Sequence, residues 1–136
     1  MLPDCPLCRH DGGRVLWRGP LCRIVLADEP GYSGFCRVIF QRHVRELTDL
    51  SVGERHTLDR VVDATERALR TTLAPDKVNV VSLGNMVPHV HVHVVARFCD
   101  DPHFPGPPFG APSRMGRPRS CDPDAIARAL RSHLDA

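Results

Sequence analysis

The sequence lacks three features that would assign a function class at once: a long apolar run, a strong net charge and a phosphate-binding P-loop. Without an apolar run of membrane-spanning length, no transmembrane helix is expected. The formal net charge of +2 is small and the arginines are scattered, which argues against binding to nucleic acid. No Gly-x-x-x-x-Gly-Lys-Ser/Thr motif occurs, so ordinary nucleoside triphosphatase chemistry is not supported.

The N-terminus and the cysteines also set expectations. The first five residues have neither the basic region nor the apolar segment of a secretory signal, so we expect a soluble protein of the cytoplasm. In that compartment the six cysteines need not pair as disulfides. The length of 136 residues suits a single domain, 1–136, and the apolar fraction of 42% and charged fraction of 25% are typical of globular proteins.

The segment from Pro88 to Arg97 is the most informative stretch of the chain. Its valines are β-branched and favour a strand, in which successive side chains point to opposite faces. This alternation places His89, His91 and His93 on one face and the intervening valines on the other, toward the core. Neighbouring histidines on such a face have Cα atoms roughly 6.5 to 7 Å apart, so they can share a substrate, a metal ion or a chain of hydrogen bonds.

The run from His89 to Val95 matches the signature His-φ-His-φ-His-φ-φ, in which φ is an apolar residue. The chain therefore resembles the histidine triad (HIT) family of nucleotidyl hydrolases and transferases, and the resemblance extends from Cys5 to about Phe109. It is most similar to the small bacterial members that begin with a Cys-x-x-Cys pair. The resemblance implies a homodimer and a small-molecule nucleotide substrate cleaved at its α-phosphate, either a nucleoside phosphoramidate or a dinucleoside polyphosphate such as diadenosine tetraphosphate.

His91 is predicted to be the catalytic nucleophile, because a neutral imidazole is not repelled by a negatively charged phosphate as an anion would be. It would form a covalent nucleotidyl-imidazole that water then hydrolyses. We expect a backbone carbonyl to bind its other ring nitrogen and so to fix the reactive tautomer. His93 would stabilise the developing charge. The leaving group could take its proton from His89 or from His91 itself.

Cys5 and Cys8 form one half of a tetrahedral zinc site, and no second Cys-x-x-Cys pair occurs to complete it. In some bacterial HIT proteins such a pair is joined by a histidine that closes the second strand region and by the first histidine of the triad. The corresponding residues here are His43 and His89. The resemblance therefore implies a structural zinc ion, in which case His89 is not a free acid. The alternative is a pair of reduced thiols left from an ancestral site.

The resemblance also implies which residues contact the nucleotide. Asp28 corresponds to an acidic residue that accepts hydrogen bonds from the ribose hydroxyls. Gly84 and Asn85 correspond to the connection that holds the α-phosphate. Phe104 belongs to an aromatic and proline-containing segment that lies over the nucleotide site, often that of the partner subunit. Without the resemblance, Asp28 is an ordinary loop carboxylate and Gly84-Asn85 a hairpin turn.

Two positions depart from the family's pattern. Phe35 stands where many members have a histidine, and Met86 where a serine or threonine is common, so one polar contact is expected to be lost at each. A purine pocket could come from Leu21, Ile24 and Leu26, though no residue selects adenine over guanine. Two alternatives stay open: a metalloenzyme whose strand histidines bind a catalytic zinc or iron directly, and a non-catalytic nucleotide sensor.

The remaining elements follow from hydrophobic periodicity and turn residues. We expect a hairpin over 14–26 that turns at Gly19-Pro20, a strand over 35–40, a helix from the Ser51 and Glu54 capping box to Pro75, a strand over 77–83, and a short helix after Asp122. The proline-rich segment 98–121 cannot form regular structure, although its aromatic residues need packing partners. The predicted fold class is α+β, with an antiparallel sheet of about five strands, one long helix and a short C-terminal helix.

Overall fold

The sheet of the protein has five strands, all antiparallel, in a computed structural model that describes residues 2–135. The elements in chain order are α1 (Pro6–Arg9), β1 (Arg14–Arg18), β2 (Cys22–Leu26), β3 (Phe35–Phe40), the 3-10 turn η1 (Leu47–Asp49), α2 (Val52–Leu73), β4 (Lys77–Val81), β5 (His91–Arg97) and α3 (Pro123–Leu134). The strand order is β1-β2-β3-β5-β4, so β3 and β5 are neighbours although they are distant in sequence. This confirms the predicted α+β fold.

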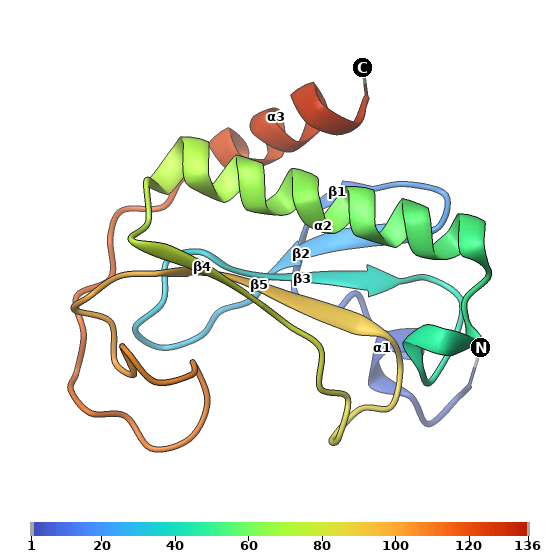
Figure 1. Cartoon of the computed structure of the whole chain (residues 1–136), viewed down its shortest axis with the longest axis horizontal. Helices are drawn as coiled ribbons and strands as arrows, with labels where there is room; N and C mark the ends of the chain where they lie inside the picture. The colour runs from blue at the N-terminus through green and yellow to red at the C-terminus, as the bar shows by residue number, and fades with distance from the viewer. Residues whose placement is uncertain (1, 136) are drawn as a thin grey trace.

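The long helix α2 begins and ends where the sequence predicts. Ser51 and Glu54 form the capping box, since each side chain accepts a hydrogen bond from the backbone N–H of the other residue. The helix ends at Ala74, in the left-handed conformation, directly before Pro75. Helices α2 and α3 cover the same face of the sheet (Figure 1). The residues that α2 buries are Leu58, Val61, Val62, Ala64, Thr65, Ala68 and Leu69.

No helix within residues 2–135 is long and apolar enough to cross a membrane.

Strand β5 divides its side chains between the two faces of the sheet, as the alternation predicts. Its valines at alternate positions lie in the core beneath the helices, whereas His91 and His93 lie on the opposite face. The strand begins at His91, because Pro88 has no N–H to donate and the His89 amide bonds to the Val87 carbonyl in the preceding turn at 2.8 Å. His89 therefore stands before the strand and not within it, and its side chain turns toward Cys5 and Cys8. The prediction that all three histidines lie on one face of a strand is wrong for His89.

Two irregular segments border the face of the sheet that the helices leave free. The N-terminal segment with α1 lies at one end of this face, and the proline-rich segment 98–121 lies at the other (Figure 1). The N-terminal segment packs on the sheet through a small apolar cluster of Cys5, Leu7, Val25 and Ile39. The histidines of β5 are thus enclosed by chain without periodic structure.

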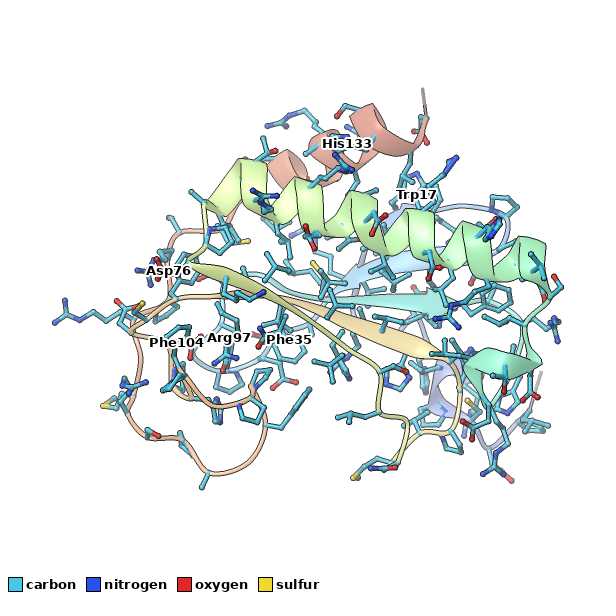
Figure 2. The ribbon with its side chains drawn as sticks, in the orientation of Figure 1. Trp17, Phe35, Asp76, Arg97, Phe104 and His133 are labelled. Carbon is cyan, nitrogen blue, oxygen red and sulfur yellow. The ribbon has the colours of Figure 1, made fainter. Side chains whose placement is uncertain are left out.

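A buried ion pair anchors the proline-rich segment to the sheet. Arg97, the last residue of β5, donates to the Asp101 carboxylate through Nε at 2.7 Å and Nη2 at 3.1 Å, and the two side chains are 2% and 3% exposed. Asp101 also accepts the backbone N–H groups of Phe98, His103 and Phe104. The guanidinium lies 5.6 Å from the centre of the Phe104 ring (Figure 2). The segment has the irregular structure that its prolines predict, and its beginning, with Phe98, Asp101 and Pro102, is nevertheless buried.

Replacement of Asp101 by alanine is expected to lower the free energy of unfolding by about 3–5 kcal/mol, because the Arg97 guanidinium would stay buried without a counter-charge. Urea unfolding followed by circular dichroism measures this change. Asp100→Ala is the matched control, since its carboxylate pairs with Arg119 at the surface and its loss should change stability little. Equal effects of the two substitutions would contradict the anchoring role.

Candidate active site

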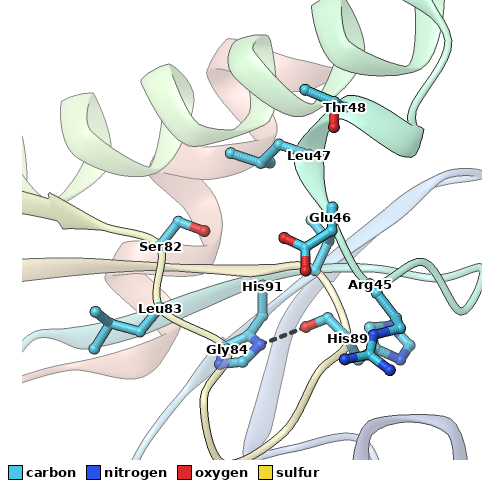
Figure 3. Close-up of a pocket in the computed structure, with 10 residues that line it drawn as sticks. Arg45, Glu46, Leu47, Thr48, Ser82, Leu83, Gly84, His89 and His91 are labelled. Carbon is cyan, nitrogen blue, oxygen red and sulfur yellow. Dashed lines mark hydrogen bonds between the residues drawn. The ribbon is translucent and has the colours of Figure 1, made fainter.

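His91, the first residue of β5, is held in one tautomer by the backbone. Its Nδ1 lies 2.6 Å from the carbonyl oxygen of His89 (Figure 3). A carbonyl only accepts hydrogen bonds, so Nδ1 carries the proton and donates it, and Nε2 of the neutral ring carries the lone pair. The half-buried ring therefore offers Nε2 as a nucleophile or a base, in the tautomer expected from the sequence.

His93 lies beside His91 in an apolar environment. The two ring centroids are 5.1 Å apart, and the rings of Phe35 and Phe109 lie 5.6 and 5.3 Å from that of His93. The buried Nδ1 of His93 has no hydrogen-bond partner among the described residues. Burial, and to a smaller extent the nearby His91 and Arg37, together lower the pKa of His93 to about 4. His93 is therefore neutral at pH 7.

A cleft of about 640 Å³ opens over these histidines, which is within the usual range for small-molecule sites. Gly84 and Asn85, predicted to hold the α-phosphate, both line it. Gly84 has a φ of +79°, a conformation that residues with a Cβ rarely adopt, so the connection from β4 to β5 favours glycine here. The cleft is lined by Leu7, Gly12, Glu29, Arg37, Leu83, Gly84, Asn85, Met86, Val87, His91, His93 and Phe109.

A second cavity of about 310 Å³ meets this cleft at Leu83, Gly84 and His91 (Figure 3). Its other lining residues come from the connection between β4 and β5 and from the segment around η1: Arg45, Glu46, Leu47, Thr48, Ser82, His89 and Val90. His91 thus borders both cavities, which leaves room on two sides of its ring for the two parts of a substrate.

Cys5, Cys8, His43 and His89 come together beneath this site. Their ligand atoms all lie within 4.8 Å of one another. The Nδ1 of His89 is 3.4 Å from Cys5 Sγ, and the Nδ1 of His43 is 3.4 Å from Cys8 Sγ. The Nε2 of His89 donates to the carbonyl of Phe40 at 2.6 Å, so its Nδ1 is unprotonated and faces the cluster. Two thiols and two ring nitrogens form a donor set that suits tetrahedral zinc.

Two of the predicted nucleotide contacts lie outside the cleft of this chain. Asp28 is exposed and does not line it, whereas the next residue, Glu29, does. Phe104 packs on the anchoring ion pair, and the aromatic residue that reaches the cleft from the proline-rich segment is Phe109. Contacts of Asp28 and Phe104 with a nucleotide stay predictions.

The prediction that Leu21, Ile24 and Leu26 form a purine pocket is wrong. Ile24 is completely buried in the core beneath the helices, and Leu21 and Leu26 pack against the same core. The cause is the alternation along β2, which turns Arg23 and Val25, not Ile24, toward the face that carries the histidines.

Sequence reasoning missed several residues that line the cleft, among them Arg37 and Phe109. Arg37 is the register partner of His93, and the sequence did not reveal that β3 pairs with β5. The available signal was a lone charge within an otherwise apolar strand. Phe35, at the start of the same strand, presents a ring edge to His93, which explains why Nδ1 of His93 finds no partner there.

The fold and the site define a class: an α+β protein that places a triad of histidines at the start of an inner strand, beside a cleft of nucleotide size. The family model of the HIT domain matches residues 11–100, which is most of the chain. The protein belongs to the HIT domain family.

Two characterised proteins are similar to this chain over about half of their own length. The AP-4-A phosphorylase of Mycobacterium tuberculosis is 32% identical over 107 residues, which cover 74% of this chain and 55% of that protein. The asymmetrical bis(5'-nucleosyl)-tetraphosphatase of Schizosaccharomyces pombe is 31% identical over 91 residues, which cover 63% of this chain and 50% of that protein. The chain spans about half the length of the curated relatives it matches.

Solved structures of the same family share the fold. The histidine triad protein blr8122 of Bradyrhizobium japonicum superposes with a TM-score of 0.73 at 26% identity, covering 91% of this chain and 92% of that one. A zinc-bound histidine triad family protein of Mycobacterium smegmatis superposes with a TM-score of 0.63 at 22% identity, covering 97% and 94%. The fold therefore extends over nearly the whole chain.

The buried, neutral His93 should make stability depend on pH. Its pKa is about 4 in the folded protein against 6.5 for an ordinary histidine, so the unfolded chain binds more protons between these values. The free energy of unfolding should therefore fall as the pH is lowered from about 6.5 to about 4. This part of the dependence should be absent in His93→Gln and retained in the exposed control His56→Gln. Urea unfolding across this pH range measures it, and parallel curves for wild type and His93→Gln would contradict it.

Proposed function

We propose that the protein is a nucleotide hydrolase or nucleotidyl transferase that acts at the α-phosphate through a covalent nucleotidyl-His91. The observation that carries this proposal is the hydrogen bond from His91 Nδ1 to the His89 carbonyl, which in the neutral ring puts the lone pair on Nε2, beside the cleft. Family membership and the names of the two curated relatives support a nucleotide substrate. The proposed substrate classes are nucleoside phosphoramidates and dinucleoside polyphosphates.

The reaction takes two displacements at one phosphorus. In the first, Nε2 of His91 forms a bond to the α-phosphorus, and the bond to the leaving oxygen or nitrogen breaks with its electron pair on the leaving group. In the second, water attacks the same phosphorus, the bond to Nε2 breaks with its electron pair on the ring, and a nucleoside monophosphate is released. The proton that the attacking water loses to solvent balances the one that the leaving group takes up from solvent. The proton stays on Nδ1 throughout, hydrogen-bonded to the His89 carbonyl, so the ring returns to its reactive tautomer.

Neighbouring groups would stabilise the charge that develops on the phosphate oxygens. The amide side chain of Asn85 and the backbone N–H groups next to Gly84 are donors at the cleft wall. His93 would face the phosphate with Nε2, since its Nδ1 is buried between aromatic rings. Asp28 is proposed to accept hydrogen bonds from the ribose at the rim of the cleft.

We further propose that the protein forms a homodimer. Strand β4 is an edge of the sheet, and two apolar side chains are exposed there: Val80, within the strand, at 49%, and Leu83, two residues after it, at 53%. An exposed apolar edge of this kind is suited to pairing with a second copy. Phe104 of the partner subunit would then be the aromatic residue over the nucleotide.

The cluster of Cys5, Cys8, His43 and His89 is proposed to hold a structural zinc ion, which would cross-link the N-terminal segment to the start of β5. The donor set supports this, and so does the family relationship to a protein described as zinc-bound. With His89 as a ligand, the remaining chemistry belongs to His91 and His93.

Of the alternatives, direct binding of a catalytic metal by the strand histidines has the least support. The side chain of His89 points into the cysteine cluster, so the three histidines do not converge on one point, and His91 has only Nε2 free. Within residues 2–135, that cluster is the only group of potential metal ligands. A nucleotide sensor without turnover is distinguished by the activity measurement that follows.

Replacement of His91 by alanine should lower the turnover of adenosine phosphoramidate and diadenosine tetraphosphate by roughly four to six orders of magnitude, as expected for loss of a nucleophile. Liquid chromatography of the released AMP measures the rate, with inorganic phosphate added in parallel to test phosphate in place of water as acceptor. The exposed His56→Ala on α2 is the control and should keep full activity. Activity that survives in His91→Ala, or a folded wild type without turnover, would contradict the proposal.

The zinc proposal predicts one equivalent of zinc per chain in the purified protein. Cys8→Ser and His43→Ala should each lose most of it and unfold at a lower temperature, because one of the four ligands is missing. Elemental analysis and thermal unfolding provide the two measurements. Cys99→Ser, at an exposed thiol outside the cluster, should retain both the metal and the unfolding temperature. Zinc content that is equal in all four proteins would contradict the assignment.

A further inference from the structure

Arg37 is the only charged residue of β3, whose other five residues are apolar. Its register partner on β5 is His93, so both side chains lie on the face of the sheet opposite the helices. Directly opposed residues of antiparallel strands have Cα atoms about 4.5–5.5 Å apart. The arginine therefore extends from the floor of the cleft immediately beside the histidines.

Two hydrogen bonds hold its guanidinium in the cleft, where it also lies over the Phe35 ring, 5.8 Å from the ring centre. Nη1 donates to the carbonyl of Gly12 at 3.0 Å, and Nη2 donates to the carboxylate of Glu29 at 3.3 Å. An arginine has five N–H donors, so three remain for a ligand. The side chain is 25% exposed, which means that the group is positioned by the protein and still open to the cleft.

The fold alone does not account for a charge at this place. Arg37 is the only arginine or lysine among the described residues that line the cleft, and Glu29 is the only carboxylate. A partly exposed pair at 3.3 Å contributes little to stability. An apolar residue would continue the strand equally well, so the guanidinium is better explained by what enters the cleft.

We propose that Arg37 is a specificity-determining residue that binds the phosphate chain beyond the scissile bond, so that the protein prefers polyphosphate-bridged dinucleosides to nucleoside phosphoramidates. This inference rests on the proposed function. With the α-phosphate at His91, the next phosphate of a chain comes within reach of the neighbouring strand. A hydrogen bond from guanidinium to phosphate is charge-assisted and stronger than one between neutral groups. A phosphoramidate ends in an amine and has no second phosphate to offer.

Glu29, the carboxylate partner of Arg37, provides a second test in which the opposite change of substrate preference is expected. The Glu29 carboxylate offsets the positive charge of the guanidinium and repels the same phosphates. Its removal should therefore strengthen the preference that removal of Arg37 weakens. A purely structural ion pair would respond to both substitutions in the same direction.

The experiment measures selectivity, the ratio of kcat/KM for diadenosine tetraphosphate to kcat/KM for adenosine phosphoramidate. In Arg37→Leu this ratio should fall about 10- to 100-fold, the effect of losing one hydrogen bond between charged groups. In Glu29→Gln it should rise. Arg55→Leu is the matched control, because Arg55 also pairs with a carboxylate at 3.3 Å but lies on the exposed side of α2, and it should leave the ratio unchanged.

The outcomes separate this inference from the function on which it rests. Wild-type turnover of both substrates with an unchanged ratio in Arg37→Leu would overturn the inference and leave the proposed function intact. A ratio that falls in both Arg37→Leu and Glu29→Gln would also overturn it, since the pair would then only position β3. No wild-type turnover would overturn both. Should Arg37→Leu fail to fold, the rise expected for Glu29→Gln decides the question alone.

Discussion

The hydrogen bond from His91 Nδ1 to the carbonyl of His89 is the contact on which the rest of the site depends. It requires His89 to turn its carbonyl toward β5 while its side chain points the other way, into the cysteine cluster. Two further bonds hold this arrangement, from His89 Nε2 to the Phe40 carbonyl and from its backbone N–H to the Val87 carbonyl. The residue that orients the proposed nucleophile is thus fixed at several points.

Polar contacts also fix the two segments that border the cleft. The helices cover only one face of the sheet, so the histidine face is bordered by segments that have no periodic apolar stripe to pack. Each segment is tied down by polar side chains instead. At one end the cluster around Cys5 and Cys8 joins α1 to the start of β5, and at the other the Arg97–Asp101 pair holds the proline-rich segment and with it Phe109.

The sequence predicted what depends on local periodicity and on short motifs. Alternation over 88–97 assigned the two faces of β5, the capping box located the start of α2, and Cys5 and Cys8 together with the family resemblance identified the cluster that the structure brings together. It could not predict what depends on strand pairing. The position of Arg37 beside His93 follows only from the register of β3 with β5. The proline-rich segment has no hydrophobic periodicity, so its sequence does not indicate that Phe109, and not Phe104, lines the cleft.

The central claim is that the reaction passes through a covalent bond to His91, and the most direct measurement is to isolate that species. The protein would be mixed with diadenosine tetraphosphate, quenched in alkali within the first turnover because phosphorus–nitrogen bonds are labile in acid, digested, and analysed by tandem mass spectrometry. The account predicts an adenylate on His91 in the peptide that contains the triad. Rapid product formation with no adduct, or an adenylate on a different residue, would contradict it.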